Sequence, residues 1–287
     1  MWQDVLTENF LRKLDGLTLN ARAASRAGTG GQRRSKARGG SVEFADFREY
    51  MPGDDTRRID WSAFARFDKL YIRLFLDERD TLLTIWLDCS ASMVGKADRA
   101  RQLAAALCYL ALTRFDRAAV CAVGDGLKLR SEVFSGRAAF HRVVKFIDSL
   151  AFSGNTELLK ALKSAPPRSG GISVVLSDLL MDTDCRQAIS FLKFCRQDVA
   201  VLQLLTPEEL EPVLEGPTRL VSAEDEPAVD IAASPMALEA YQRVLEAFVG
   251  GIKAHCFSQG AAYLLVNTSI ELDRLVFNGL AVSGVVR

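Results

Sequence analysis

The fold of this chain is decided by residues 84–93, which read Thr-Ile-Trp-Leu-Asp-Cys-Ser-Ala-Ser-Met. The apolar run that enters this stretch, 82–87, has the length and composition of a buried strand. The run ends on Asp88, and hydroxyl side chains follow two and four positions later, at Ser90 and Ser92. A carboxylate and two alternate hydroxyls can be aimed at one point by a tight loop, which is the ligand chemistry of Mg²⁺ or Ca²⁺. The alternative is that Asp88 caps the next turn and the serines are solvated.

The sequence after Asp88 alternates between strand and helix patterns. Asp125-Gly126 is a hairpin signal, which makes 127–130 an antiparallel neighbour of the strand before it. Apolar strands separated by helices predict an α/β fold: a doubly wound, mostly parallel sheet with an antiparallel edge strand, preceded by an N-terminal extension. Strands are expected over 82–87, 118–123, 172–176, 199–205 and 262–266, and helices over about 98–115, 137–150, 185–195 and 236–257.

Composition and charge are those of an ordinary globular protein. The chain has 287 residues, of which 49% are hydrophobic and 25% charged, enough for one large domain with an appendage. Lys+Arg and Asp+Glu both total 36, so the charge balance gives no support for nucleic-acid binding. The six cysteines form no C-x-x-C pair, which is typical of a reduced, cytoplasmic protein. We expect neither a signal peptide nor a membrane span, and contact with the inner membrane through partners at most.

Three segments are expected along the chain: 1–40, 41–80 and 81–287, the last being the α/β domain. The first segment combines a short amphipathic helix with a glycine-rich basic strap over 22–38. The strap is either a flexible linker or a patch for phosphate or for an acidic partner surface.

Residues 41–80 have a different texture, with aromatic side chains placed between charges of both signs. We expect this segment to pack on the main domain, with its Arg, Asp and Trp side chains partly buried in paired contacts. The alternative is a recognition surface. Its candidate partner-binding residues are Arg57, Arg58, Asp60, Trp61 and Arg66.

Two further oxygen groups are placed to join Asp88. Thr156 lies in the loop that precedes a helix, and Asp178 follows the apolar strand 172–176. Adjacent parallel strands end close together, so Asp88 and Asp178 are expected to flank one ion. That ion is Mg²⁺, or another divalent cation such as Mn²⁺ or Ca²⁺. The expected metal ligands are Asp88, Ser90, Ser92, Thr156 and Asp178.

These motifs resemble those of known families. The D-x-S-x-S run, the loop threonine and the later aspartate are similar to the metal-ion-dependent adhesion site of von Willebrand factor A domains. The segment before them resembles the signature of a bacterial A-domain-like family catalogued as domain of unknown function fifty-eight, over roughly residues 30–280. The matching stretches are Glu43-Phe44, Arg48-Glu49-Tyr50, Pro52-Gly53-Asp54-Asp55, Arg58-Ile59-Asp60-Trp61 and Ala65-Arg66.

The family resemblance implies a MoxR-type AAA+ ATPase as partner, with other A-domain proteins as further candidates. Our main hypothesis is a binding module without enzymatic activity, acting in the assembly or remodelling of client proteins. Its divalent ion would keep one coordination position open for an acidic side chain of the partner. The alternative is a metal-dependent hydrolase of phosphate esters, which needs a general base near the ion; Glu157 is the candidate that the site loops offer. A third hypothesis is a scaffold that binds no metal.

Other catalytic motifs fit this sequence less well. A phosphate-binding loop ending at Gly95-Lys96 would need glycine at position 90 and Ser or Thr at position 97, where Ser90 and Ala97 stand. A serine hydrolase would need a usable histidine, and both histidines, His141 and His255, fall on expected helices.

Overall fold

The computed structural model describes residues 2–19, 43–51, 56, 59–76, 81–114, 116–180, 185–212, 217–220, 229–232 and 235–287. The chain divides into two compact units, one formed by Met1–Thr29 with Thr81–Arg287 and the other by Gly30–Asp80. The basic strap 22–38 and the candidate residues Arg57 and Arg58 lie outside the described residues.

The larger unit is built on a sheet of seven strands. Strands β11, β8, β7, β3 and β4 are parallel to their neighbours, whereas β5 and β6 (Phe134–Ser135) both pair with β4 in the antiparallel direction. The predicted doubly wound, mostly parallel sheet is therefore confirmed. Its strand order is β11 (Ala262–Asn267), β8 (Asp198–Leu205), β7 (Ile172–Ser177), β3 (Leu82–Asp88), β4 (Arg117–Gly124) and β5 (Gly126–Arg130).

The central strand β3 shows why the sheet needs a layer of helices on each face. Ile85 and Leu87 belong to one hydrophobic cluster and Trp86, between them, to a second. Successive side chains of a strand point to opposite faces, so an unbroken apolar run must be covered on both. All three side chains are almost completely buried.

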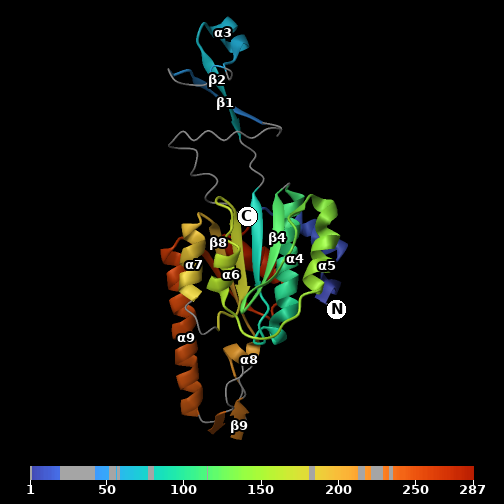
Figure 1. Ribbon diagram of the computed structural model, residues 1–287, viewed down its shortest axis with the longest axis vertical. Coiled ribbons are helices and arrows are strands. Elements are labelled where there is room, and N and C mark those ends of the chain that lie inside the picture. Colours follow the sequence, from blue (N-terminus) through green and yellow to red (C-terminus); the bar gives the residue numbers. More distant parts are fainter. Residues whose placement is uncertain are drawn as a thin grey trace. The chain divides into compact units, whose positions relative to one another are not determined.

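Helices cover the two faces in separate groups (Figure 1). On one face α4 (Ala97–Thr113) and α5 (Phe140–Asp148) pack with the N-terminal helices η1 (Trp2–Val5) and α1 (Glu8–Leu14), and with α10 (Leu272–Arg274) and the π-helical η5 (Leu275–Leu280). On the other face lie α6 (Leu158–Ser164), α7 (Cys185–Phe194) and the long α9 (Pro235–Ser258). Helix α4 is buried along nearly its whole length, as its continuous apolar sequence predicts.

The predicted hairpin at the sheet edge is confirmed. Gly126 has a φ of +98°, a conformation that L side chains rarely adopt, and β5 folds back on β4 directly after it. Between β8 and α9 lie α8 (Pro207–Leu210) and a separate two-stranded sheet, in which β9 (Pro217–Leu220) pairs with β10 (Val229–Ala232).

The smaller unit consists of β1 (Glu43–Glu49) paired antiparallel with β2 (Tyr71–Leu76), and of α3 (Trp61–Phe67). Helix α3 is capped by Asp60, whose carboxylate accepts hydrogen bonds from the backbone amides of Ser62 and Ala63. This is a standard helix cap, and it explains the burial of Asp60. Within the described residues, no helix is long and apolar enough to cross a membrane.

Candidate metal centre

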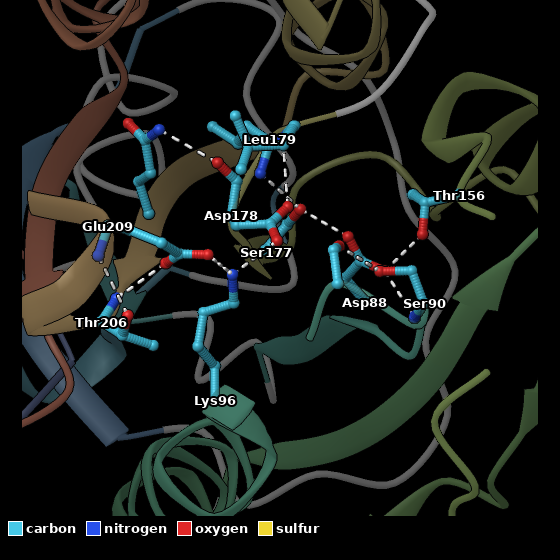
Figure 2. Close-up of polar contacts among 12 residues, drawn as sticks. Asp88, Ser90, Lys96, Thr156, Ser177, Asp178, Leu179, Thr206 and Glu209 are labelled. Carbon is cyan, nitrogen blue, oxygen red and sulfur yellow. Dashed lines mark hydrogen bonds and ion pairs between the residues drawn. The ribbon is translucent and has the colours of Figure 1, made fainter. Parts of the chain in front are cut away.

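The candidate site lies where two neighbouring strands end. Asp88 is the last residue of β3, while β7 ends at Ser177 and is followed by Asp178. Strands β3 and β7 are parallel and pair up to Leu87 and Leu176, so these polar residues stand at the same end of the sheet (Figure 2). Asp88 and Asp178 thus stand at the ends of adjacent strands, as the sequence indicated.

The Asp88 carboxylate is buried and is surrounded by neutral donors. Its Oδ1 accepts hydrogen bonds from the Thr156 hydroxyl and from the Ser90 amide at 3.0 Å, and its Oδ2 accepts one from the Ser177 hydroxyl at 2.6 Å. Burial raises the pKa of Asp88 above its ordinary value; the nearby negative charge of Asp178 acts in the same direction, and the three hydrogen bonds oppose it. The protein therefore keeps a desolvated carboxyl group here with no cation among its described contacts.

The hydroxyls around Asp88 come from two loops that hold each other. The Oγ atoms of Ser90 and Ser92 lie 3.0 Å apart, and the amide of Ala91 between them donates to the carbonyl of Gly154 at 2.7 Å. Since Gly154 lies two positions before Thr156, this bond fixes the two hydroxyl-bearing loops side by side. Of the expected ligand side chains, the Thr156 hydroxyl contacts Asp88, while Ser90 and Ser92 lie in the adjoining loop.

Lys128 on β5 strengthens the junction between these loops. Its Nζ donates to the carbonyl of Cys89 at 2.8 Å and to the carbonyl of Ser153 at 2.5 Å. The amide of Ser153 donates back to the same Cys89 carbonyl at 2.9 Å. The strand hairpin at the sheet edge therefore positions the oxygen groups of the site.

Asp178 faces a different partner. Its Oδ2 lies 2.8 Å from Nζ of Lys96, and both side chains are 1% exposed. Its Oδ1 accepts a hydrogen bond from the amide of Leu180. The same Lys96 ammonium lies 2.5 Å from Oε1 of Glu209. Burial would lower the pKa of Lys96, but the two carboxylates outweigh it and raise that pKa, so the lysine is charged.

Glu209 in turn belongs to a capping box at the start of α8. Its Oε2 accepts from the amide of Thr206 at 2.8 Å, while its own amide donates to the Thr206 hydroxyl at 3.2 Å. The Tyr241 hydroxyl of α9 donates to the Glu209 carbonyl at 2.6 Å. Lys96 is therefore anchored to the turn after β8 and, through it, to α9.

Sequence reasoning missed three residues of this site, and each had a weak signal. Ser177 precedes Asp178 at the end of an apolar strand, so either side chain was placed to meet Asp88. Lys96 follows Gly95 at the end of an incomplete phosphate-binding motif. Glu209 sits in a Thr-Pro-Glu-Glu run, which is a helix-start pattern.

The residues present fit a hard divalent cation in one half of the site. Asp88, Ser90, Ser92 and Thr156 supply carboxylate and hydroxyl oxygens, which Mg²⁺ and Mn²⁺ prefer. In the other half, Oδ2 of Asp178 lies 2.8 Å from Nζ of Lys96, so this carboxylate already has a cation of the chain as its partner. Among the described residues no group of three or more His, Cys, Asp or Glu side chains is placed to hold a metal ion, so a cation here would depend on hydroxyl ligands.

The sequence candidates for a partner surface are only partly described. Asp60 is buried as a helix cap, but Trp61 is 64% exposed and Arg66 is exposed as well. Within the smaller unit both side chains are thus mostly uncovered, and the expectation that they are buried by packing on the main domain stays a prediction. Trp61 contacts Phe64 on the same short helix, edge to face with ring centroids 6.3 Å apart.

Nucleophilic side chains near the site are not activated. Cys89 lies next to Asp88, and burial raises the pKa of its thiol to about 12, so it is not a thiolate at neutral pH. The histidines lie on helices as predicted, His141 on α5 and His255 on α9. His141 Nδ1 lies 2.8 Å from the Ala138 carbonyl, and His255 Nε2 lies 3.1 Å from the Arg186 carbonyl.

Comparison with known sequences gives a family match. A family model described as protein of unknown function DUF58 matches residues 46–247. The chain is 24% identical, over 241 residues, to an uncharacterized protein of Mycobacterium tuberculosis and to one of Mycobacterium bovis. These alignments cover 80% of this chain and 76% of the mycobacterial proteins.

Comparison with solved structures gives distant likenesses. The conserved hypothetical protein BatB from Bacteroides thetaiotaomicron is 14% identical, with a TM-score of 0.45, over 71% of this chain and 98% of that one. An aerotolerance-related membrane protein from Bacteroides fragilis is 12% identical, with a TM-score of 0.39, over 70% of this chain and 98% of that one.

Proposed function

This chain belongs to the DUF58 family, and we propose that it is a protein-binding module that holds a divalent cation beside Asp88 and uses it to bind an acidic side chain of a partner. The observation that carries the proposal is the surroundings of Asp88. A buried carboxylate at the end of a central strand accepts hydrogen bonds from the Thr156 and Ser177 hydroxyls, and the loop that it enters carries the hydroxyls of Ser90 and Ser92. Keeping a carboxyl group out of water is unfavourable unless a charge or a strong donor compensates it.

The chemistry of such a cation favours binding of an external acid. Asp88 would supply the negative charge, and the hydroxyls would complete part of the ligand shell as neutral donors. A Mg²⁺ or Mn²⁺ ion prefers six oxygens and stays electrophilic when most of its ligands are neutral. An Asp or Glu side chain of a partner would then gain a strong charge-assisted contact at a remaining position.

Hydrolysis has less support than binding. It would need a carboxylate or an imidazole free to activate water next to the cation. Within the described part of the chain, Asp178 and Glu209 form ion pairs with Lys96. The carboxylate of Glu157 lies 3.8 Å from the ammonium of Lys160. We therefore place the phosphate-ester hydrolase second.

The cation proposal is tested by calorimetric titration of the purified protein with Mn²⁺. Wild type should bind one ion, and Asp88→Asn should lose that binding, since the variant keeps the shape of the side chain but not its charge. The matched control is Asp125→Asn, which removes an exposed carboxylate paired with Lys160 and should bind Mn²⁺ as wild type does. Failure of wild type to bind Mn²⁺, or equal binding by Asp88→Asn, would refute the cation proposal.

The partner proposal rests on the family resemblance and points to a MoxR-type AAA+ ATPase, with other A-domain proteins as further candidates. Affinity for the purified ATPase of the same host should be measured for wild type and Asp88→Asn in the same Mg²⁺ buffer. This design avoids a chelator, which would also strip Mg²⁺ from the nucleotide of the ATPase. We expect binding by wild type and a large loss in the variant. Equal affinities would mean that the Asp88 site takes no part in this recognition.

A further inference from the structure

The buried lysine of the site has a position that the proposed function does not explain. Lys96 is 1% exposed, and its ammonium lies between the carboxylates of Asp178 and Glu209 (Figure 2). Removing an ammonium ion from water costs several kcal/mol unless oppositely charged groups meet it. Here two carboxylates do so, and the lysine side chain runs from the start of α4 to the ends of β7 and β8.

The two polar residues at the end of β7 divide their roles. Ser177 donates to Asp88 Oδ2, whereas the next side chain, Asp178, contacts Lys96. Each is held in its direction by a backbone amide, from Leu179 to the Ser177 hydroxyl and from Leu180 to Asp178 Oδ1. The charge of Asp178 is therefore already satisfied by a cation that belongs to the chain itself.

We propose that the ammonium of Lys96 neutralises Asp178 and so determines which carboxylate of the site contacts a divalent cation, and how tightly that cation binds. In this arrangement Asp88 is the carboxylate that contacts the ion, and Asp178 acts as the counter-ion of Lys96. This inference rests on the proposed function and specifies the regulation of the same site.

Two consequences follow from the position of this ammonium. It repels an entering divalent cation, so it weakens binding relative to a site with two available carboxylates. It also ties the site to the capping box of α8 through Glu209 and to α9 through Tyr241. If wild type binds the divalent cation only weakly, the site is filled mainly when a partner supplies an additional ligand to that cation.

The inference is tested with a charge-neutral double replacement, Lys96→Met with Asp178→Asn. This variant removes both members of the pair, so the net charge near Asp88 does not change, and such paired replacements are often tolerated by the fold. If Asp178 is the counter-ion of Lys96, the double variant should bind Mn²⁺ within about threefold of wild type in calorimetry. If Asp178 is a direct ligand, binding should fall as it does in Asp88→Asn, and the inference would be overturned.

The single variant Lys96→Met should bind Mn²⁺ more tightly than wild type. It removes the repulsion and releases Asp178, so Mn²⁺ affinity should rise at least about tenfold. An affinity equal to or below that of wild type would contradict the inference, provided that circular dichroism shows a folded protein. Should this variant fail to fold, the double replacement still decides.

The outcomes separate this inference from the proposed function. Mn²⁺ binding by wild type that is lost in the double replacement refutes the role of Lys96 alone. Absence of detectable binding by wild type refutes the proposed function, and this inference with it, whatever Lys96→Met binds. An absence of binding by wild type and by all variants refutes the proposed function and this inference together.

Discussion

Two carboxylates stand at the ends of neighbouring strands, and they are satisfied in different ways. Asp88 and Asp178 are both almost fully buried, at 3% and 1% exposure. Asp88 accepts hydrogen bonds from hydroxyl and amide groups, while Asp178 forms an ion pair with Lys96. Neutral donors leave the negative charge of a carboxylate in place, whereas an ammonium cancels it. The comparison teaches that position in the sheet selects candidate ligands, and that their local countercharges differ, which is the basis of the separate roles proposed for the two carboxylates.

The largest expected effect on the free energy of unfolding comes from removing the cation that pairs with Asp178. In the absence of divalent cations, Lys96→Met should lower the free energy of unfolding by about 3–5 kcal/mol, because it leaves buried carboxylates without their cation. Urea denaturation followed by circular dichroism measures the change. Adding Asp178→Asn should recover much of the loss. A loss below about 1 kcal/mol in the single variant would show that the pair is not as desolvated as the structure indicates.

A smaller effect on the free energy of unfolding is expected from removing the bonds that join the loops beside Asp88. Lys128→Met removes the bonds from its ammonium to the Cys89 and Ser153 carbonyls, and it should cost about 1–2 kcal/mol of unfolding free energy. Lys160→Met is the matched control, since that lysine pairs with Asp125 in solvent, and it should leave the urea midpoint unchanged. Equal midpoints for the two variants would mean that Lys128 does not stabilise the loop junction.

The smallest effect is expected for Asp88→Asn without cation. Burial disfavours the charged form of Asp88, and its pKa is raised accordingly, so replacing it with a neutral group of the same shape removes an unfavourable charge. The lost hydrogen-bond acceptor offsets part of that gain, so unfolding free energy should change by less than about 1 kcal/mol. Thermal melting with and without Mn²⁺ checks this: the ion should raise the melting temperature of wild type and not of the variant. A strongly destabilised variant would assign Asp88 a structural role.

The sheet and the half of the site around Asp88 could be predicted from the sequence. Apolar runs such as 172–176 are long enough for one buried strand, and a run that ends in polar residues marks the edge where sites form. The hairpin at Gly126 was predictable because its turn requires a positive φ that glycine adopts without strain. These features depend on local chemistry and on strand adjacency.

The partner of Asp178 could not be predicted in the same way. A lysine at a helix start is most often solvated, and the burial of Lys96 comes from Asp178 and Glu209, which are distant in the sequence. The direction of each side chain at the end of β7 depends on amide bonds from the following loop.

The parallel arrangement of β3 and β7 has a consequence for the order of folding. Groups that contact Asp88 come from the turn after β3, the loop before α6 and the end of β7, separated by up to 89 positions in the chain. Parallel strands pair only after the long crossover between them is closed, so we expect these contacts to form late. A cation that binds the assembled oxygens binds the native state and not the open chain, and it shifts the equilibrium by mass action. The amides of Ser90 and Leu179, which bond to Asp88 and to Ser177, should therefore gain protection from hydrogen exchange when Mn²⁺ binds the completed sheet.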